Sequence, residues 1–118
     1  DNGLLNSISF KFSEDKGKLL ENTVFLALRR KNKQVYYHRK KYECDFVIVA
    51  KNKVEAVLQV TAMLNEENEA REIKGLLEAL EAYNLDEGII LTEDQEEVRT
   101  INKKKISIMP IWKWLLSE

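Results

Sequence analysis

The sequence predicts an α/β domain in which helices flank a mixed central sheet and a β-hairpin lies near the C-terminus. Residues 14–31 and 70–83 carry apolar side chains at intervals of three and four, the spacing of amphipathic helices. Residues 43–61 form two apolar runs around a polar turn, which is typical of a hairpin. The second helix follows this hairpin and leads to another strand, so the strands that it connects are expected to be parallel neighbours.

The other strands are expected from shorter segments. Residues 34–38 (QVYYH) are rich in β-formers. Residues 88–92 (GIILT) are apolar throughout, as in a strand that is covered on both faces. Residues 98–101 and 106–108 should form the C-terminal hairpin, and residues 112–116 should close the chain as a short helix or turn. The first three strands then form an antiparallel meander.

Composition limits the function classes. The 118 residues suit one domain, residues 1–118, with its own core. The formal net charge of −1 provides no overall field for nucleic acid or acidic lipid, so contact with either would need a local patch. The single cysteine, Cys44, excludes an internal disulfide and does not support a cysteine-based metal site. Because no run of about 18 apolar residues and no signal peptide is seen, we expect no membrane association and a cytoplasmic location.

The start of the chain indicates a piece of a longer protein. The first residue is Asp1 instead of Met, with no start signal before it, and we expect a C-terminal fragment. Residues 4–12 alternate in part (ISFKF) and predict a short strand or an irregular lead-in.

A polar cluster is predicted at the end of the hairpin remote from its turn. With the turn at residues 51–53, pairing outward places Asp45 opposite Gln59. Side chains alternate along a strand, so Thr61 shares their face and Cys44 points to the other, as a small buried residue. Asp45 is equally well interpreted as a metal ligand or as an acid bonded to backbone, because a buried carboxylate needs one or the other. For Gln59, a hydrogen bond to Asp45 is the simpler role.

Two basic stretches could meet a nucleic-acid backbone. They are residues 29–33 (RRKNK) and 38–41 (HRKK), with three tyrosines between or beside them. A solvated charged face is the alternative, and acidic runs elsewhere (NEENEARE, EDQEE) would repel DNA. A single histidine at a strand end is also commonly just exposed. The candidate nucleic-acid-binding residues are Arg29, Arg30, Lys33, His38, Arg39 and Lys41.

The order of these segments resembles the PD-(D/E)xK nuclease fold. More closely, the chain is similar to the nuclease-like C-terminal domain that follows the P-loop ATPase module in a group of archaeal and bacterial AAA-type ATPases. The segments that carry the resemblance are DNGLL, GKLLENTVFLALRR, ECDFVIV, VLQVT, GIILT and MPIWKWLL. The likeness covers nearly the whole chain and depends on their order and spacing, not on any one motif.

The resemblance implies a restriction-endonuclease-like αβββαβ core and a Mg²⁺ site. The helix acid of that site is Glu21, the strand Asp is Asp45, the second acid position is Gln59, and the lysine position is Thr61. The last two depart from the family pattern. Mg²⁺ prefers hard, commonly anionic oxygen ligands, and a nearby cation stabilises the reacting phosphate. Because Gln59 brings no charge and Thr61 no cation, the resemblance implies a degenerate catalytic site with a weak or absent Mg²⁺ ion.

A cation could enter this site from elsewhere. Lys41 precedes the Asp45 strand, and Arg71 and Lys74 lie on the second helix. Ordinary solvated charges are the simpler interpretation of each.

Three functions stay open on the sequence alone. The first is a nuclease-like accessory domain of an ATPase with a degenerate metal site, with the upstream ATPase domain and DNA as partners. The second is an active Mg²⁺-dependent endonuclease, and the third is a structural interaction module without nucleic acid, since a fold alone does not fix a function.

Overall fold

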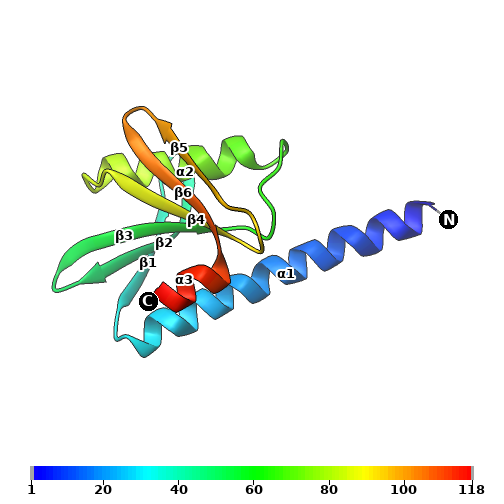
Figure 1. Ribbon diagram of the computed structural model, residues 1–118, viewed down its shortest axis with the longest axis horizontal. Helices are drawn as coiled ribbons and strands as arrows, with labels where there is room; N and C mark the ends of the chain where they lie inside the picture. Colours follow the sequence, from blue (N-terminus) through cyan, green and yellow to red (C-terminus); the bar gives the residue numbers. More distant parts are fainter. Residues whose placement is uncertain (1, 118) are drawn as a thin grey trace.

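The computed structural model describes the backbone of residues 2–117 and the side chains of residues 15–117. Within this range the chain forms three helices and one six-stranded sheet, in the order that the sequence predicts (Figure 1). The helices are α1 (Asn2–Arg30), α2 (Glu69–Ala82) and α3 (Ile111–Ser117). The strands are β1 (Gln34–Arg39), β2 (Glu43–Ala50), β3 (Lys53–Val60), β4 (Glu87–Thr92), β5 (Glu97–Ile101) and β6 (Lys104–Pro110).

The first helix is longer than predicted. The strand or irregular lead-in expected at residues 4–12 is wrong, because α1 runs without a break from Asn2 to Arg30. Alternation over the five residues of ISFKF is too short to distinguish a strand from a helix. Just beyond the helix, Asn32 takes a left-handed conformation with φ 59°, which asparagine tolerates better than most residues.

The sheet is mixed, as predicted. Its strand order is β1-β2-β3-β4-β6-β5. The first three strands form an antiparallel meander, and α2 connects β3 to β4, which lies parallel to it. The C-terminal hairpin of β5 and β6 is confirmed, and it joins the sheet through β6, parallel to β4, so that β5 is an edge strand.

The central hairpin has the predicted register but a shorter turn. Phe46 pairs with Leu58 in its middle, as expected. Near the turn, Ala50 pairs with Lys53, one residue earlier than predicted. The turn therefore consists of residues 51–52, which both have positive φ (55° and 62°), as in the type I′ turns that suit hairpins. A register shift in the adjoining strands restores the predicted pairing further along.

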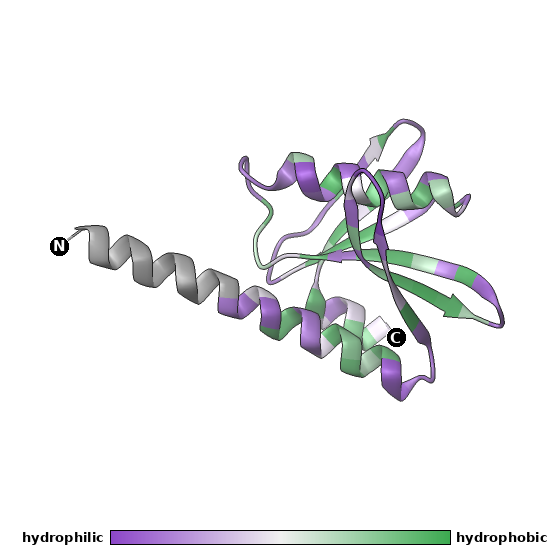
Figure 2. Cartoon of the chain, turned by 180° about the vertical axis from the view of Figure 1, so that it is seen from behind, coloured by the Kyte–Doolittle hydropathy of each residue, from purple (hydrophilic) through white to green (hydrophobic). Residues whose placement is uncertain are grey.

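Helices cover both faces of the sheet. Helix α2 packs on one face, and α1 and α3 pack on the other (Figure 1). Hydropathy follows these layers, with apolar strands in the centre of the sheet and polar turns at its margins (Figure 2). On the α2 side the buried residues include Val47, Val57, Leu76, Leu80, Ile90 and Ile106. On the α1 side they include Val24, Leu28, Phe46, Leu58, Leu91 and Trp114.

An irregularity in β2 changes the face of Cys44. Its register with β1 shifts here: Tyr36 pairs with Val47, but His38 pairs with Cys44. Strand β2 therefore contains one extra residue between these two pairs. Cys44 therefore packs with Val47 and Val57 on the α2 side, and its predicted orientation to the other face is wrong. Its interpretation as a buried small residue is confirmed, since it is fully buried and burial raises the pKa of its thiol to about 12.

Helix α2 approaches β2 closely at Gly75. A Cβ atom at this position would overlap the backbone oxygen of Glu43 and would lie 2.7 Å from Nε2 of Gln59. Only a residue without a side chain allows the helix backbone to lie against the strand here.

We expect Gly75→Ala to lower the free energy of unfolding by about 1–3 kcal/mol or more, because overlap with backbone atoms cannot be relieved by a side-chain rotation. Chemical denaturation measures the change. Gly17→Ala on α1 is the matched control: no atom lies within 4 Å of its added Cβ. That variant should be neutral or slightly more stable, because alanine favours the helix by up to about 1 kcal/mol. Equal effects at the two positions would contradict the close packing of α2 on β2.

Candidate functional site

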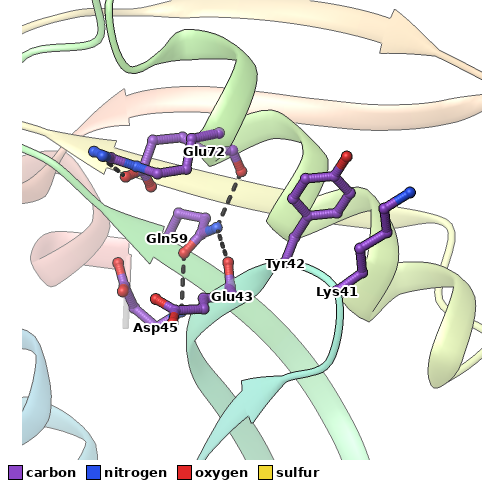
Figure 3. A pocket seen from close by; sticks show the side chains of 7 residues that line it. Lys41, Tyr42, Glu43, Asp45, Gln59 and Glu72 are labelled. Atoms are coloured by element: carbon purple, nitrogen blue, oxygen red, sulfur yellow. Dashed lines mark hydrogen bonds and ion pairs between the residues drawn. The ribbon is translucent and has the colours of Figure 1, made fainter.

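A polar cavity of 290 Å³ lies between α2 and the end of the central hairpin (Figure 3). The β2–β3 ladder ends at the pair Phe46–Leu58, and the two strands separate beyond it. Asp45 and Gln59 come together at this point, as the hairpin register predicts. The cavity is lined by Lys41, Tyr42, Glu43, Asp45, Gln59, Arg71 and Glu72.

The Gln59 amide joins three parts of the fold. Its Oε1 accepts a hydrogen bond of 2.9 Å from the backbone N–H of Asp45. Its Nε2 donates to the backbone oxygens of Glu43 at 2.8 Å and Glu72 at 3.0 Å. The side chain is 1% exposed, so these bonds replace the water that it has lost. Gln59 therefore ties β3 to β2 and to α2.

The Asp45 carboxylate is also bonded to the backbone. Its Oδ2 accepts a hydrogen bond of 2.9 Å from the N–H of Val60. Burial raises the pKa of Asp45, and this hydrogen bond opposes the shift. The backbone-bonded interpretation of Asp45 is thus the one that the geometry favours.

Glu72, which is not among the predicted site residues, lines the cavity together with Asp45 and the more exposed Glu43. The Glu72 side chain is 13% exposed and lies 3.6 Å from Arg71. Burial raises its pKa to about 7, the charge of Asp45 adds to the shift, and Arg71 opposes it. One sequence signal could have found it: Glu72 directly precedes Ile73 and lies one turn before Leu76, at the border of the apolar stripe of α2.

The predicted helix acid, Glu21, lies on α1 at the edge of this region. It does not line the cavity. Its side chain is partly exposed, yet burial raises its pKa and the charge of Asp45 raises it further, so the two carboxylates interact. The acids of α1, β2 and α2 thus influence one another electrostatically.

Two oxygens of the magnesium site that the resemblance implies are already engaged by the backbone. The oxygen of Gln59 faces the N–H of Asp45, and one oxygen of Asp45 faces the N–H of Val60. A ligand oxygen directs its lone pairs at the metal, so these contacts compete with coordination. Among the side chains of residues 15–117, no group of three His, Cys, Asp or Glu residues is arranged to hold a metal ion.

Thr61 does not join the cavity, contrary to its predicted position beside Asp45 and Gln59. Strand β3 ends at Val60, and the chain then bends away. The Thr61 hydroxyl is 3.5 Å from the backbone oxygen of Met63 and 3.5 Å from Nδ2 of Asn68, in the loop before α2.

The predicted nucleic-acid-binding residues fall at opposite ends of β1. Arg29 and Arg30 end α1, where the Arg29 guanidinium lies 5.6 Å from the centre of the Phe25 ring. Lys33 follows, and its Nζ binds Glu55 at 2.8 Å. These three residues lie away from the cavity.

The other end of β1 carries Arg39 and Lys41. Arg39 pairs with Glu43 at 3.4 Å, and Lys41 lines the cavity. The two groups are separated by the length of β1, which has six residues. At a rise of roughly 3.3 Å per residue this length is about 15–20 Å. The structure therefore does not bring the candidate basic residues into one patch.

The expectation that His38 is exposed with these basic residues is wrong. The ring is 7% exposed and lies against α2. Its Nε2 is 2.9 Å from Oε1 of Glu78, and its Nδ1 is 3.1 Å from the hydroxyl of Tyr83. Glu78 also accepts a hydrogen bond of 3.1 Å from the N–H of Tyr42, so this cluster fixes the β1–β2 turn on α2. Periodicity cannot predict this, because the partners are about 40 residues away.

These features define a class of protein: a small mixed α/β domain with a polar cavity where two hairpin strands separate beneath a helix. The chain belongs to the family described as Domain of unknown function (DUF4143), whose model matches residues 16–114. It is also 42% identical, over 122 residues, to the uncharacterized protein MJ1544 of Methanocaldococcus jannaschii. That match covers 94% of this chain and 27% of the relative, so the chain spans about a quarter of the relative's length.

Among the residues that the structure describes, none of the helices has the length and apolar character of a membrane span.

We expect Gln59→Glu to be destabilised by about 3 kcal/mol or more, although the resemblance implies an acid at this position. A carboxylate cannot donate to the oxygens of Glu43 and Glu72, and it would bring a charge close to Asp45. Chemical denaturation measures the loss, with Gln34→Glu on exposed β1 as the control. A Gln59→Glu variant as stable as the wild type would show that the amide donors are not required.

We expect Glu72→Gln to stabilise the protein at pH 8 by about 3 kcal/mol and to change little at pH 5, since each pKa unit is worth about 1.4 kcal/mol. The folded pKa of about 7 exceeds the ordinary 4.5, so the folded state holds this proton more tightly. The free energy of unfolding of the wild type should therefore fall as the pH rises from 4.5 to about 7. Above pH 7, ionisation of Glu72 should lower it no further. Urea denaturation at both pH values tests this, with exposed Glu66→Gln as the control. A stability difference that does not depend on pH would contradict the raised pKa.

Proposed function

We propose that the chain is a nuclease-like accessory domain of a larger ATPase, and that it contacts nucleic acid or a partner without cutting it. The observation that best supports this is the position of Gln59. It stands where the resemblance implies a metal-binding carboxylate, yet all three of its polar contacts are with backbone groups of the domain itself. The residue therefore stabilises the fold at the place where a nuclease would carry out its chemistry.

The element order supports the nuclease-like part of this proposal. A helix, three antiparallel strands, a helix and a parallel strand follow one another, as in the αβββαβ core that we assign to the restriction-endonuclease-like class. The assigned Asp45 and Gln59 meet where two strands of this core separate.

The relative's length supports the accessory part. About three-quarters of that protein lies outside the region matched by this chain. We propose that an ATPase domain occupies the remainder and that the protein acts in the cytoplasm.

A second candidate is an active Mg²⁺-dependent endonuclease, and one observation favours it. Glu72 places a carboxylate in the same cavity as Asp45, and their charges interact. With Glu21 nearby, these acids could replace the charge that Gln59 lacks.

We expect no cleavage of supercoiled plasmid DNA by the chain in Mg²⁺ or Mn²⁺, measured by gel electrophoresis with a parallel Asp45→Asn, Glu72→Gln double variant. Metal-dependent cleavage that the double variant loses would overturn the degenerate site and establish the endonuclease.

We expect labelled single- or double-stranded oligonucleotides to bind, with an affinity that falls as salt rises, because phosphate contacts release counterions. Fluorescence anisotropy at several salt concentrations measures this. If neither oligonucleotide binds even at low salt, nucleic-acid contact is ruled out and a protein-interaction module is left.

A further inference from the structure

Cationic side chains from two elements lie at or beside the cavity: Lys41 and Arg71 line it, and Lys74 lies beside the lining residue Tyr42. Lys41 comes from the β1–β2 turn, and Arg71 and Lys74 come from neighbouring positions on α2. Tyr42 lies between them: the Nζ atoms of Lys41 and Lys74 are each 5.7 Å from the centre of its ring. Figure 3 shows Tyr42 and Lys41 side by side at the margin of the cavity, with Glu43 next to Tyr42 and Asp45 further away. We call Lys41, Tyr42, Arg71 and Lys74 the cavity rim.

Two of the three rim cations have no carboxylate partner among the side chains that the structure describes. The Arg71 side chain is 73% exposed, but it is already paired with Glu72 at 3.6 Å. Within residues 15–117, neither Lys41 nor Lys74 forms an ion pair. By contrast, Lys33 is bound to Glu55, and Arg39 is paired with Glu43. A cation that already has a carboxylate partner gains less from a phosphate, because the first pair must be broken.

The rim is held in place before any ligand arrives. The N–H of Tyr42 donates to both carboxylate oxygens of Glu78, at 3.1 and 3.3 Å, and the same carboxylate binds the buried His38. Glu78 lies one helical turn after Lys74, so the two elements that carry the rim are joined beside it. Binding at a rim that is already positioned loses less conformational entropy.

The charges differ in exposure. The acids Asp45 and Glu72 are half-buried in the lining of the cavity, whereas the cations Lys41, Arg71 and Lys74 are exposed, as is Glu43, a further acid of the lining. A small anion inside the cavity would face the carboxylates of Asp45 and Glu72. An extended polyanion that crosses the mouth would meet several cations and stay further from those two acids, so this arrangement fits a chain of phosphates better than a single one.

We propose that the cavity rim binds the phosphodiester backbone of a nucleic acid, and that the Arg29, Arg30 and Lys33 group at the end of α1 does not. The inference rests on the proposed nucleic-acid contact and names the surface that makes it.

Two triple variants with the same change of charge test the inference. One replaces Lys41, Arg71 and Lys74 by glutamine, and the other replaces Arg29, Arg30 and Lys33 by glutamine. Fluorescence anisotropy measures the affinity of both for single- and double-stranded oligonucleotides at several salt concentrations. Since each removes three positive charges, a difference between them reports on location and not on net charge.

We expect the rim variant to lose affinity by about tenfold or more, and its salt slope to become shallower by about 2 to 3. The α1 variant should change affinity by less than about threefold. Comparing the two oligonucleotides tells which strand form the rim prefers. Thermal melting and amide NMR spectra check the folding of both variants. Should the rim triple variant unfold, Lys74→Glu against Arg30→Glu makes the same comparison with one exposed residue each.

Two results would overturn the inference while leaving nucleic-acid contact intact: a larger loss in the α1 variant, or equal losses in both. Competition by polyglutamate as effective as that by oligonucleotide would instead identify the rim as a site for acidic protein. Absence of binding by the wild-type chain at low salt would refute the proposed nucleic-acid contact itself, and the rim inference with it.

Discussion

The contact between the Gln59 amide and the backbone is the interaction on which the rest of the structure depends. At the end of the central hairpin, β2 and β3 no longer pair, and α2 crosses above the gap. Backbone groups left unpaired in such a place would each cost free energy. One side chain supplies an acceptor for Asp45 and donors for Glu43 and Glu72, and thereby closes the gap. The glycine at position 75 allows the helix to come close enough for this to happen.

The cavity is a consequence of the same arrangement. Because Gln59 holds the strands and the helix together on one side, the side chains of Asp45 and Glu72 are left facing a common space. Burial raises both pKa values, and a neighbouring charge adds to each shift: that of Glu43 for Asp45, and that of Asp45 for Glu72. Arg71 opposes both shifts, since its positive charge favours the ionised form of each acid.

Much of the fold could be predicted from the sequence, because the signals are local. The hairpin register follows from two apolar runs and a polar turn, and the parallel strand follows from the helix that precedes it. One error, at residues 4–12, comes from an alternation too short to distinguish a strand from a helix. The others lie where one extra residue in a strand, or a partner distant in sequence, determines the structure. The irregularity in β2 moves Cys44 to the other face, and His38 is buried by groups on α2. For the site, strand pairing predicts that Asp45 meets Gln59. It cannot predict Glu72, because the rotation of α2 on the sheet depends on tertiary packing.

The overlap that any side chain at Gly75 would create has a consequence for comparing proteins of this family. The glycine and the amide restrict each other, because a Cβ atom at position 75 would lie 2.7 Å from Nε2 of Gln59. A glycine at position 75 together with glutamine at position 59 would therefore be a sequence marker of this architecture and not of catalysis. A relative with an acid at position 59 would need a different means of joining helix to strand.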